Sequence, residues 1–193
     1  AEKIWLMDVE APRTARSCEP GQFVIVKIDE KGERIPLTIC DYDREAGLVT
    51  IVFQEVGAST HRMAQMREGD AFEDFVGPLG RPSELIGEDP ETLKQQKILF
   101  VAGGVGTAPV YPQVKWMKAH GAEVDVIVGA KTKDLLILEE EMRREAGSLY
   151  ITTDDGSYGR GGMVTDAIRD LVENQGKHYD RCVAIGPVIM MKF

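Results

Sequence analysis

The residues with the clearest chemical potential form a glycine-rich turn, Gly103-Gly104-Val105-Gly106-Thr107-Ala108-Pro109, between an apolar run and a helical pattern. Glycine lets the main chain approach a ligand closely and adopt positive φ angles. The turn opens a helix, whose free N–H groups and dipole favour an anion such as a pyrophosphate, and Thr107 adds a hydroxyl donor. The run nearly fits the dinucleotide fingerprint but has Pro109 where the last glycine would stand. It predicts nucleotide binding, with an ordinary tight turn as the alternative.

Polar residues recur where the later apolar runs end. Lys131 follows one such run, Asp154 and Asp155 follow the next, and Gly186-Pro187 follow the last. Ligands of open α/β sheets bind outside the carboxyl ends of the strands. We therefore expect Lys131 to pair with a phosphate, and Asp154 or Asp155 to bond a ribose or an amide. A solvated loop is the alternative for each of them.

Two further motifs lie in the first part of the chain. Arg34-Ile35-Pro36-Leu37-Thr38 enters a β-branched run, and the planar, always-charged guanidinium of Arg34 suits a phosphate. Thr38 supplies a hydroxyl to a ring nitrogen or a ribose. Gly57-Ala58-Ser59-Thr60 is a small, hydroxyl-rich turn that can cradle a phosphate at a helix start. An exposed turn charge and an ordinary N-cap are the alternatives.

The elements that position these motifs differ between the two parts of the chain. The first part predicts short strands at 23–28, 35–42 and 48–56 and a short helix at 59–66, typical of an antiparallel barrel or sandwich. Residues 81–96, rich in glycine, proline and glutamate, indicate a linker. The predicted first domain is therefore an N-terminal antiparallel β-barrel over residues 1–96, linker included.

From Lys97 onward, apolar runs alternate with helical patterns. The expected strands are 98–103, 123–130, 149–155 and 181–186, and the expected helices are 110–121, 135–147 and 163–176. This alternation predicts a parallel sheet with right-handed crossovers. The predicted second domain is a C-terminal α/β parallel-sheet nucleotide-binding domain over residues 97–193.

Composition excludes several classes of function. The net charge of -9 argues against non-specific nucleic-acid binding. Cys18, Cys40 and Cys182 have no metal-site spacing, so we expect no metal ligands and reduced thiols in the cytoplasm. No apolar run approaches the roughly 18 residues of a membrane span. Both ends of the chain fall within apolar runs, so we expect a longer natural chain.

The motifs and their order resemble the ferredoxin–NADP reductase superfamily: Arg-Ile-Pro-Leu-Thr, Gly-Ala-Ser-Thr, Val76-Gly77-Pro78-Leu79-Gly80, VAGGVGTAP and a late Gly-Pro. Within it, the chain is most similar to the small flavin subunit of the NADH-dependent ferredoxin:NADP oxidoreductases, also called sulfide dehydrogenase subunit beta or ferredoxin–NADP reductase subunit alpha. The electron-transfer subunit of dihydroorotate dehydrogenase is a near relative. The resemblance covers essentially the whole chain.

The resemblance implies that FAD binds the first domain and NAD(P)H the second. Arg34 would hold the FAD pyrophosphate, and Thr38 would lie near the flavin N5 as the catalytic position. The other implied cofactor contacts are Pro36 and Leu37 beside the flavin ring; Gly57, Ser59 and Thr60 at FAD phosphates; Gly103, Gly104, Gly106 and Thr107 at NAD(H); and Gly186 and Pro187 over the nicotinamide side.

The implied activity is electron transfer from NAD(P)H through the flavin to a larger flavin and iron–sulfur subunit, or to ferredoxin, within a hetero-oligomer. Related subunits continue into a cysteine-rich tail with a [2Fe–2S] cluster, which we expect only beyond this chain. Many relatives carry tyrosine where this chain has Leu37, and cysteine where it has Ile185. A stand-alone flavin reductase and a dinucleotide-sensing module without turnover are the alternatives, and NADH and NADPH both stay open.

Overall fold

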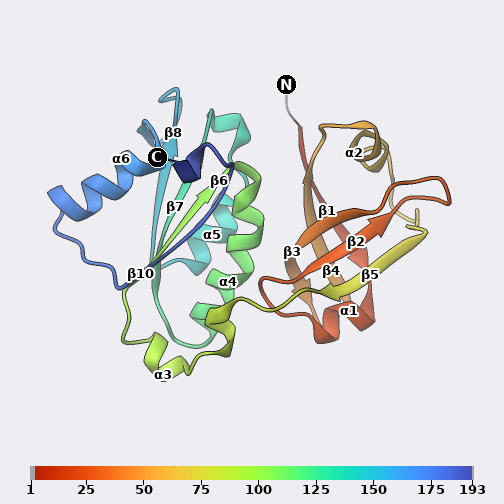
Figure 1. Cartoon of the computed structure of the whole chain (residues 1–193), viewed down its shortest axis with the longest axis horizontal. Helices are drawn as coiled ribbons and strands as arrows, with labels where there is room; N and C mark the ends of the chain where they lie inside the picture. The colour runs from red at the N-terminus through yellow and green to blue at the C-terminus, as the bar shows by residue number, and fades with distance from the viewer. Residues whose placement is uncertain (1–2, 193) are drawn as a thin grey trace. The chain divides into compact units, whose positions relative to one another are not determined.

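The computed structural model describes residues 3–192, and the chain divides between Ser83 and Glu84 into two compact units (Figure 1). Each unit has its own sheet of five strands. One sheet is antiparallel and the other is parallel, as the sequence predicts for the two domains. The predicted fold class is therefore confirmed.

The first unit is a strongly paired antiparallel sheet with two short helices. Its elements are β1 (Ile4–Glu10), α1 (Pro12–Ser17), β2 (Phe23–Lys27), β3 (Ile35–Asp43), β4 (Leu48–Gln54), α2 (Ala58–Met63) and β5 (Asp74–Leu79). The strand order is β1-β4-β3-β2-β5, and each neighbouring pair runs antiparallel. Alternate residues of β2 are fully buried, as a sheet with one face on a core requires, whereas β4 buries Val52 in addition to Val49, Ile51 and Phe53.

The core of this unit gathers side chains from strands and helices alike. It consists of Ala15, Cys18, Val24, Val26, Ile39, Val49, Ile51, Phe53 and Met63. Two of these residues come from the segment at α1, and Met63 ends α2. Both helices are therefore attached to the sheet by buried side chains, although each has only six residues.

The second unit alternates strands and helices. Its main elements are α3 (Pro90–Leu93), β6 (Ile98–Gly103), α4 (Thr107–Ala119), β7 (Val124–Ala130), α5 (Glu139–Glu145), β8 (Ser148–Thr153), β9 (Arg160–Gly161), α6 (Val164–Arg169) and β10 (Arg181–Ile185). The parallel order is β10-β6-β7-β8-β9, which places β6 in the interior of the sheet. Every residue of β6 is buried, because an interior strand of a parallel sheet is covered on both faces.

Helices cover both faces of this sheet. Figure 1 shows α6 on one face and α4 with α5 on the other. On the α6 face, Leu99, Val101 and Ile127 of the sheet pack against Val164, Ala167 and Leu171. The α6 segment continues into a π-helical turn, Asp170–Asn174.

Three local features differ from the sequence-based expectations. Helix α1 and strand β5 are additional elements. Helix α5 begins at Glu139 instead of 135, because Leu138 before it takes a left-handed conformation with φ 58°. The segment 84–96, expected as a linker, contains α3 and a 3₁₀ turn, Glu84–Gly87, with Leu85 and Leu93 buried.

The same segment groups with the second unit. An ion pair of 2.5 Å joins Glu88 Oε1 to Arg181 Nη1 at the start of β10. The compact units therefore divide at 83, thirteen residues before the domain boundary expected from the sequence. The assignment of FAD to one domain and NAD(P)H to the other stays a prediction.

Candidate functional site

The glycine-rich turn lies where strand β6 ends and helix α4 begins. Gly104 has φ +55°, a left-handed conformation that glycine adopts at little cost, and no atom lies within 4 Å of a Cβ placed there. Gly106 has an ordinary φ of -63°, but its Cβ would lie 2.4 Å from the carbonyl oxygen of Ile185. The two glycines are thus required for different reasons, one by main-chain conformation and the other by close packing.

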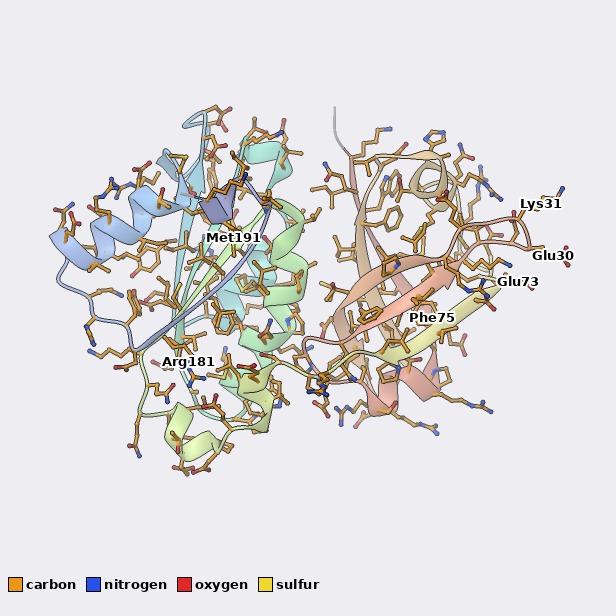
Figure 2. The ribbon with its side chains drawn as sticks, in the orientation of Figure 1. Glu30, Lys31, Glu73, Phe75, Arg181 and Met191 are labelled. Atoms are coloured by element: carbon orange, nitrogen blue, oxygen red, sulfur yellow. The ribbon has the colours of Figure 1, made fainter. Side chains whose placement is uncertain are left out.

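Glycines continue across the carboxyl end of the sheet. Gly103 pairs with Gly129, and Gly129 pairs with Thr152 on the next strand. On the other side, a Cβ on Gly186 would lie 3.3 Å from the Cα of Gly103. Strand β6 therefore ends in a glycine, glycine is the last residue but one of β7, and a glycine directly follows β10. We call these three neighbours the glycine row (Gly186, Gly103 and Gly129). In Figure 2, Met191 marks this end of β10 and Arg181 the opposite end.

Two side chains rest on the glycine row. A Cβ on Gly103 would lie 2.6 Å from Met190 Sδ, and one on Gly186 would lie 2.4 Å from Met190 Cε. A Cβ on Gly129 would lie 2.4 Å from Cγ1 of Val164, the first residue of α6. Larger residues at these three positions would displace Met190 and α6, so the row keeps the segment after Gly186-Pro187 close to the sheet.

Thr107, the first residue of α4, is fully buried, and its hydroxyl oxygen has no hydrogen-bond partner in the described part of the chain. A buried hydroxyl left unpaired costs about 1–3 kcal/mol. Helix α4 has 13 residues, long enough for its N-terminal N–H groups and dipole to attract an anion. These two features fit a dinucleotide. Its oxygen atoms can accept from the unpaired hydroxyl, and its flat ring can lie against the glycine backbone.

The loops after β7 and β8 are joined by main-chain hydrogen bonds. The amide of Asp154 donates to Ala130 O at 3.0 Å, and that of Asp155 donates to Lys131 O at 3.2 Å. The side chains of Lys131 and Asp154 are both exposed at this end of the sheet. The structure therefore brings these two predicted contacts together, although their ligands stay predictions.

Residues that the sequence reasoning missed surround the same loops. Lys133 Nζ lies 4.9 Å from the ring centroid of Tyr158, a cation–π contact, and its amide donates to Ser157 Oγ at 2.9 Å. The Tyr158 hydroxyl donates to Glu139 Oε1 at 2.9 Å. Spacing along the chain could not reveal this pair, because Glu139 lies 19 residues from Tyr158.

In the first unit, the two predicted phosphate motifs meet. Ser59 Oγ donates to Glu33 Oε2 at 2.7 Å, which joins the start of α2 to the residue before Arg34. Arg34 Nη2 donates to Asp74 Oδ2 at 2.7 Å, across strand β2. The Arg34 side chain is 62% exposed, so much of its guanidinium faces solvent. The structure thus places Arg34 and Ser59 in one neighbourhood, although 25 residues separate them in the sequence.

Thr60 has a different environment from Ser59. Its hydroxyl oxygen accepts from the amides of Val56 and Gly57, both at 3.0 Å, and donates to Gly57 O at 3.1 Å. Thr60 therefore closes its own turn, as an ordinary cap residue does. Because α2 has only six residues, its dipole adds little, and a phosphate contact here depends mainly on Arg34 and Ser59.

The flavin motif lies on β3 opposite β2. Thr38 pairs with Phe23, Leu37 with Val24 and Pro36 with Ile25. Leu37 packs against the core, Pro36 is exposed and Thr38 is half-buried. The pairing with β4 shifts register between Ile39 and Asp41, a bulge one residue beyond Thr38. Bulges redirect side chains and are frequent next to active sites.

The surroundings of Glu55, close to α2, are also polar. Its carboxylate accepts from Trp5 Nε1 at 3.0 Å and lies 2.6 Å from His61 Nδ1. These contacts, first from Trp5 and then from His61, hold the pKa of Glu55 below its ordinary value. They tie the turn before Gly57 to strand β1. No group of three or more His, Cys, Asp or Glu residues among residues 3–192 has the geometry of a metal site.

The chain is similar to several known proteins. A model of the oxidoreductase NAD-binding domain family matches residues 100–193. The dihydroorotate dehydrogenase B (NAD(+)) electron transfer subunit of Fusobacterium nucleatum is 36% identical over 195 residues, which cover all of this chain and 73% of that protein. A protein of Clostridium beijerinckii, named only for its position in the adh 3′ region, is 63% identical over 98% of this chain and 64% of its own length.

A solved structure of the NADH-dependent reduced ferredoxin-NADP oxidoreductase superposes with a TM-score of 0.87 at 40% identity, over 98% of this chain and 65% of that chain. The chain thus spans just under two thirds of the length of several of its relatives. In the described range, no helix is both long and apolar enough to cross a membrane.

Proposed function

Because this chain belongs to the family of the dihydroorotate dehydrogenase B electron transfer subunits, within the ferredoxin–NADP reductase superfamily, we propose that it transfers electrons between NAD(P)H and a bound FAD. In this proposal, the parallel-sheet unit binds the nicotinamide nucleotide and the antiparallel unit binds the flavin. The electrons continue to a partner subunit or to ferredoxin. The chain would act in the cytoplasm as part of a hetero-oligomer.

One observation carries the nucleotide half of the proposal. The turn after β6 combines a left-handed Gly104, a Gly106 without room for a side chain, and the unpaired buried hydroxyl of Thr107. A pyrophosphate at the start of α4 would receive main-chain N–H donors. The Thr107 hydroxyl would then gain the partner that the protein itself does not provide. Lys131 and Asp154, on the joined loops, would contact the far end of the nucleotide.

The flavin half of the proposal depends on the first unit. Arg34 and Ser59 would hold the phosphates, and Thr38 with Leu37 would lie beside the ring. Bound FAD would supply the redox chemistry, which is electron exchange between NAD(P)H and an acceptor that takes electrons singly. The chain's own residues bind and orient: Thr38 presents its hydroxyl at the ring, and the glycine row fixes the segment Gly186-Pro187.

The first experiment is a visible absorption spectrum of the purified chain with FAD, before and after anaerobic NADH. We expect flavin bands that bleach on NADH addition. Arg34→Ala should weaken FAD binding about tenfold or more, because a charge-assisted phosphate contact is lost. Arg44→Ala is the matched control, since Arg44 also pairs with a carboxylate, Glu19 at 2.8 Å, and lies outside the proposed site.

The outcomes separate the alternatives. Binding of NADH without FAD would contradict the proposal and favour a module that senses a dinucleotide. Bleaching followed by rapid reoxidation by free acceptors, with no stimulation by a partner subunit or ferredoxin, would favour a stand-alone flavin reductase. Equal losses in Arg34→Ala and Arg44→Ala would mean that Arg34 has no specific role.

A further inference from the structure

Both side chains that would hold the flavin phosphates already donate hydrogen bonds to carboxylates. Arg34 Nη2 lies 2.7 Å from Asp74 Oδ2, and Ser59 Oγ lies 2.7 Å from Glu33 Oε2. Carboxylate and phosphate oxygens are equivalent acceptors for a guanidinium and a hydroxyl. A serine hydroxyl has a single hydrogen to donate, so Glu33 and a phosphate would compete directly for Ser59.

These carboxylates belong to an acidic end of the first unit. Figure 2 shows Glu30 and Lys31 at the turn between β2 and β3, and Glu73 and Phe75 on either side of Asp74 at the start of β5. The amide of Glu73 donates to Ile28 O at 3.3 Å, which ties the two segments together. An anionic ligand that approaches Arg34 therefore approaches several negative charges as well.

One cation in this region is already engaged elsewhere. Arg62 of α2 pairs with Asp29 of the β2–β3 turn, and this contact holds the pKa of Asp29 below its ordinary value. Arg34 is mostly exposed and, unlike Lys31 of the same turn, belongs to the predicted flavin motif. Its charge is partly offset by Asp74, whose side chain is 31% exposed.

We propose that Glu33 and Asp74 are internal competitors of the flavin phosphates, and that they set the affinity of the chain for FAD. This inference rests on the proposed function, because it requires FAD at Arg34 and Ser59. In this role the two carboxylates keep the site polar and paired without FAD, and FAD must displace or share their hydrogen bonds. Their negative charges then weaken binding of the pyrophosphate relative to a neutral site.

Amide substitutions isolate the effect of charge. Asp74→Asn keeps an oxygen that accepts from Arg34, so the guanidinium keeps its orientation while the negative charge is removed. Glu33→Gln does the same at Ser59. One charge a few ångströms from a phosphate in a solvated site changes affinity about three- to tenfold. We therefore expect FAD to bind about three- to tenfold more tightly to Asp74→Asn, and at least twofold more tightly to Glu33→Gln, where the hydrogen bond is weaker.

The test measures the dissociation constant of FAD by flavin fluorescence and by calorimetry. The matched control is Glu30→Gln. Like Glu33→Gln, it removes one negative charge from the segment between β2 and β3, but Glu30 bonds neither Arg34 nor Ser59. It should change the FAD constant by less than twofold. In the Arg34→Ala background, Asp74→Asn should tighten FAD binding less than it does in the parent chain, because the competition for the guanidinium is gone and only the repulsion between carboxylate and phosphate is relieved. Circular dichroism of each variant checks that it folds.

Tighter binding by Asp74→Asn and Glu33→Gln, with a smaller gain from Asp74→Asn in the Arg34→Ala background, supports the inference. Unchanged or weaker binding by Asp74→Asn would overturn it, and a weaker value would make Asp74 a residue that positions Arg34. An equal gain in Glu30→Gln would also overturn it, because the effect would then be one of general charge. Failure of the parent chain to bind FAD would overturn the proposed function and this inference together.

Discussion

Gly106 lies so close to Ile185 that a Cβ on it would fall 2.4 Å from the Ile185 carbonyl oxygen. This contact joins the turn before α4 to the end of β10, and its other party is main chain, which cannot rotate away. Gly106→Ala should therefore lower the free energy of unfolding by about 2 kcal/mol, as overpacking of a close-packed contact does. It should also raise the dissociation constant of NADH at least tenfold, because the turn must shift.

A control for this variant is Gly87→Ala, in the same unit. Gly87 has no atom within 4 Å of its Cβ position and does not have a positive φ. In Gly87→Ala, the free energy of unfolding measured in urea should change by less than about 0.5 kcal/mol, as it does for ordinary surface substitutions. If Gly106→Ala unfolds at the same urea concentration as the parent chain, the contact with Ile185 is looser than described.

Thr107→Val tests the unpaired hydroxyl at the start of α4. Valine has nearly the shape of threonine but no polar atom to bury, so the free energy of unfolding should stay level or rise by up to about 1 kcal/mol. NADH should bind about tenfold less tightly if the hydroxyl bonds the dinucleotide. Thr152→Val is the matched control, because Thr152 is also buried with an unpaired hydroxyl in the described chain. Thr152→Val should raise the free energy of unfolding and leave the affinity for NADH unchanged. Equal losses of NADH affinity in both variants would contradict the assignment to Thr107.

Stability should depend on pH through Asp125. Burial opposes its ionisation, but hydrogen bonds from Lys177 at 2.7 Å and Tyr179 at 2.6 Å outweigh it, so the pKa of Asp125 lies below its ordinary value. A depressed pKa stabilises the fold above the unfolded pKa of about 3.9, and this contribution is lost as pH falls through the lower folded pKa. Asp125→Asn should cost about 1–2 kcal/mol at neutral pH.

The difference in unfolding free energy between Asp125→Asn and the parent chain should shrink below about pH 4, where Asp125 of the parent chain becomes protonated. Urea unfolding of the two proteins at neutral and acid pH measures it. The control Asp134→Asn, at an exposed position of the 3₁₀ turn Lys133–Leu135, should leave the difference in unfolding free energy from the parent chain the same at both pH values. A constant gap between Asp125→Asn and the parent down to the lowest pH would show that the carboxylate charge is not the cause.

Thiol labelling should distinguish the three cysteines. Cys18 and Cys40 are buried and Cys182 is exposed. Burial, partly opposed by Arg44, raises the pKa of Cys18 to about 11, so this thiol stays protonated near neutral pH. Iodoacetamide should modify Cys182 alone in the folded protein, and slowly, because neighbouring protein atoms desolvate part of this exposed side chain and raise the pKa of its thiol. Mass spectrometry should show one adduct before unfolding and three after it, and none before unfolding in Cys182→Ser; early modification of Cys18 would contradict the packing around α1.

The sequence predicted the elements whose signals are local. Strands β2, β3 and β4 follow from β-branched runs between charged turns, and β6 follows from an apolar run without interruption. Strand β5 was missed because Gly77 and Pro78 interrupt it, and both residues weaken a strand pattern. It forms through pairing with β2, where Ile25 lies opposite Val76.

Other features depend on contacts between distant residues. Helix α1 has six residues and no side-chain cap, and it is held by buried Ala15 and by the Thr14 hydroxyl, which donates to Gly77 O at 3.1 Å. The link between Ser59 and Glu33 spans 26 residues. Spacing along the chain could suggest which residue types bind phosphate, but not which carboxylates would meet them.

The glycine row has a consequence for how this protein can change. Because Met190 and Val164 cover Gly186, Gly103 and Gly129, no larger residue fits at these positions unless the segment after Pro187 or helix α6 moves. The exposed loops after β7 and β8, with Lys131 and Asp154, carry no such constraint. If these two residues contact the nucleotide as proposed, a designer who wishes to switch between NADH and NADPH would change these loops and leave the row intact.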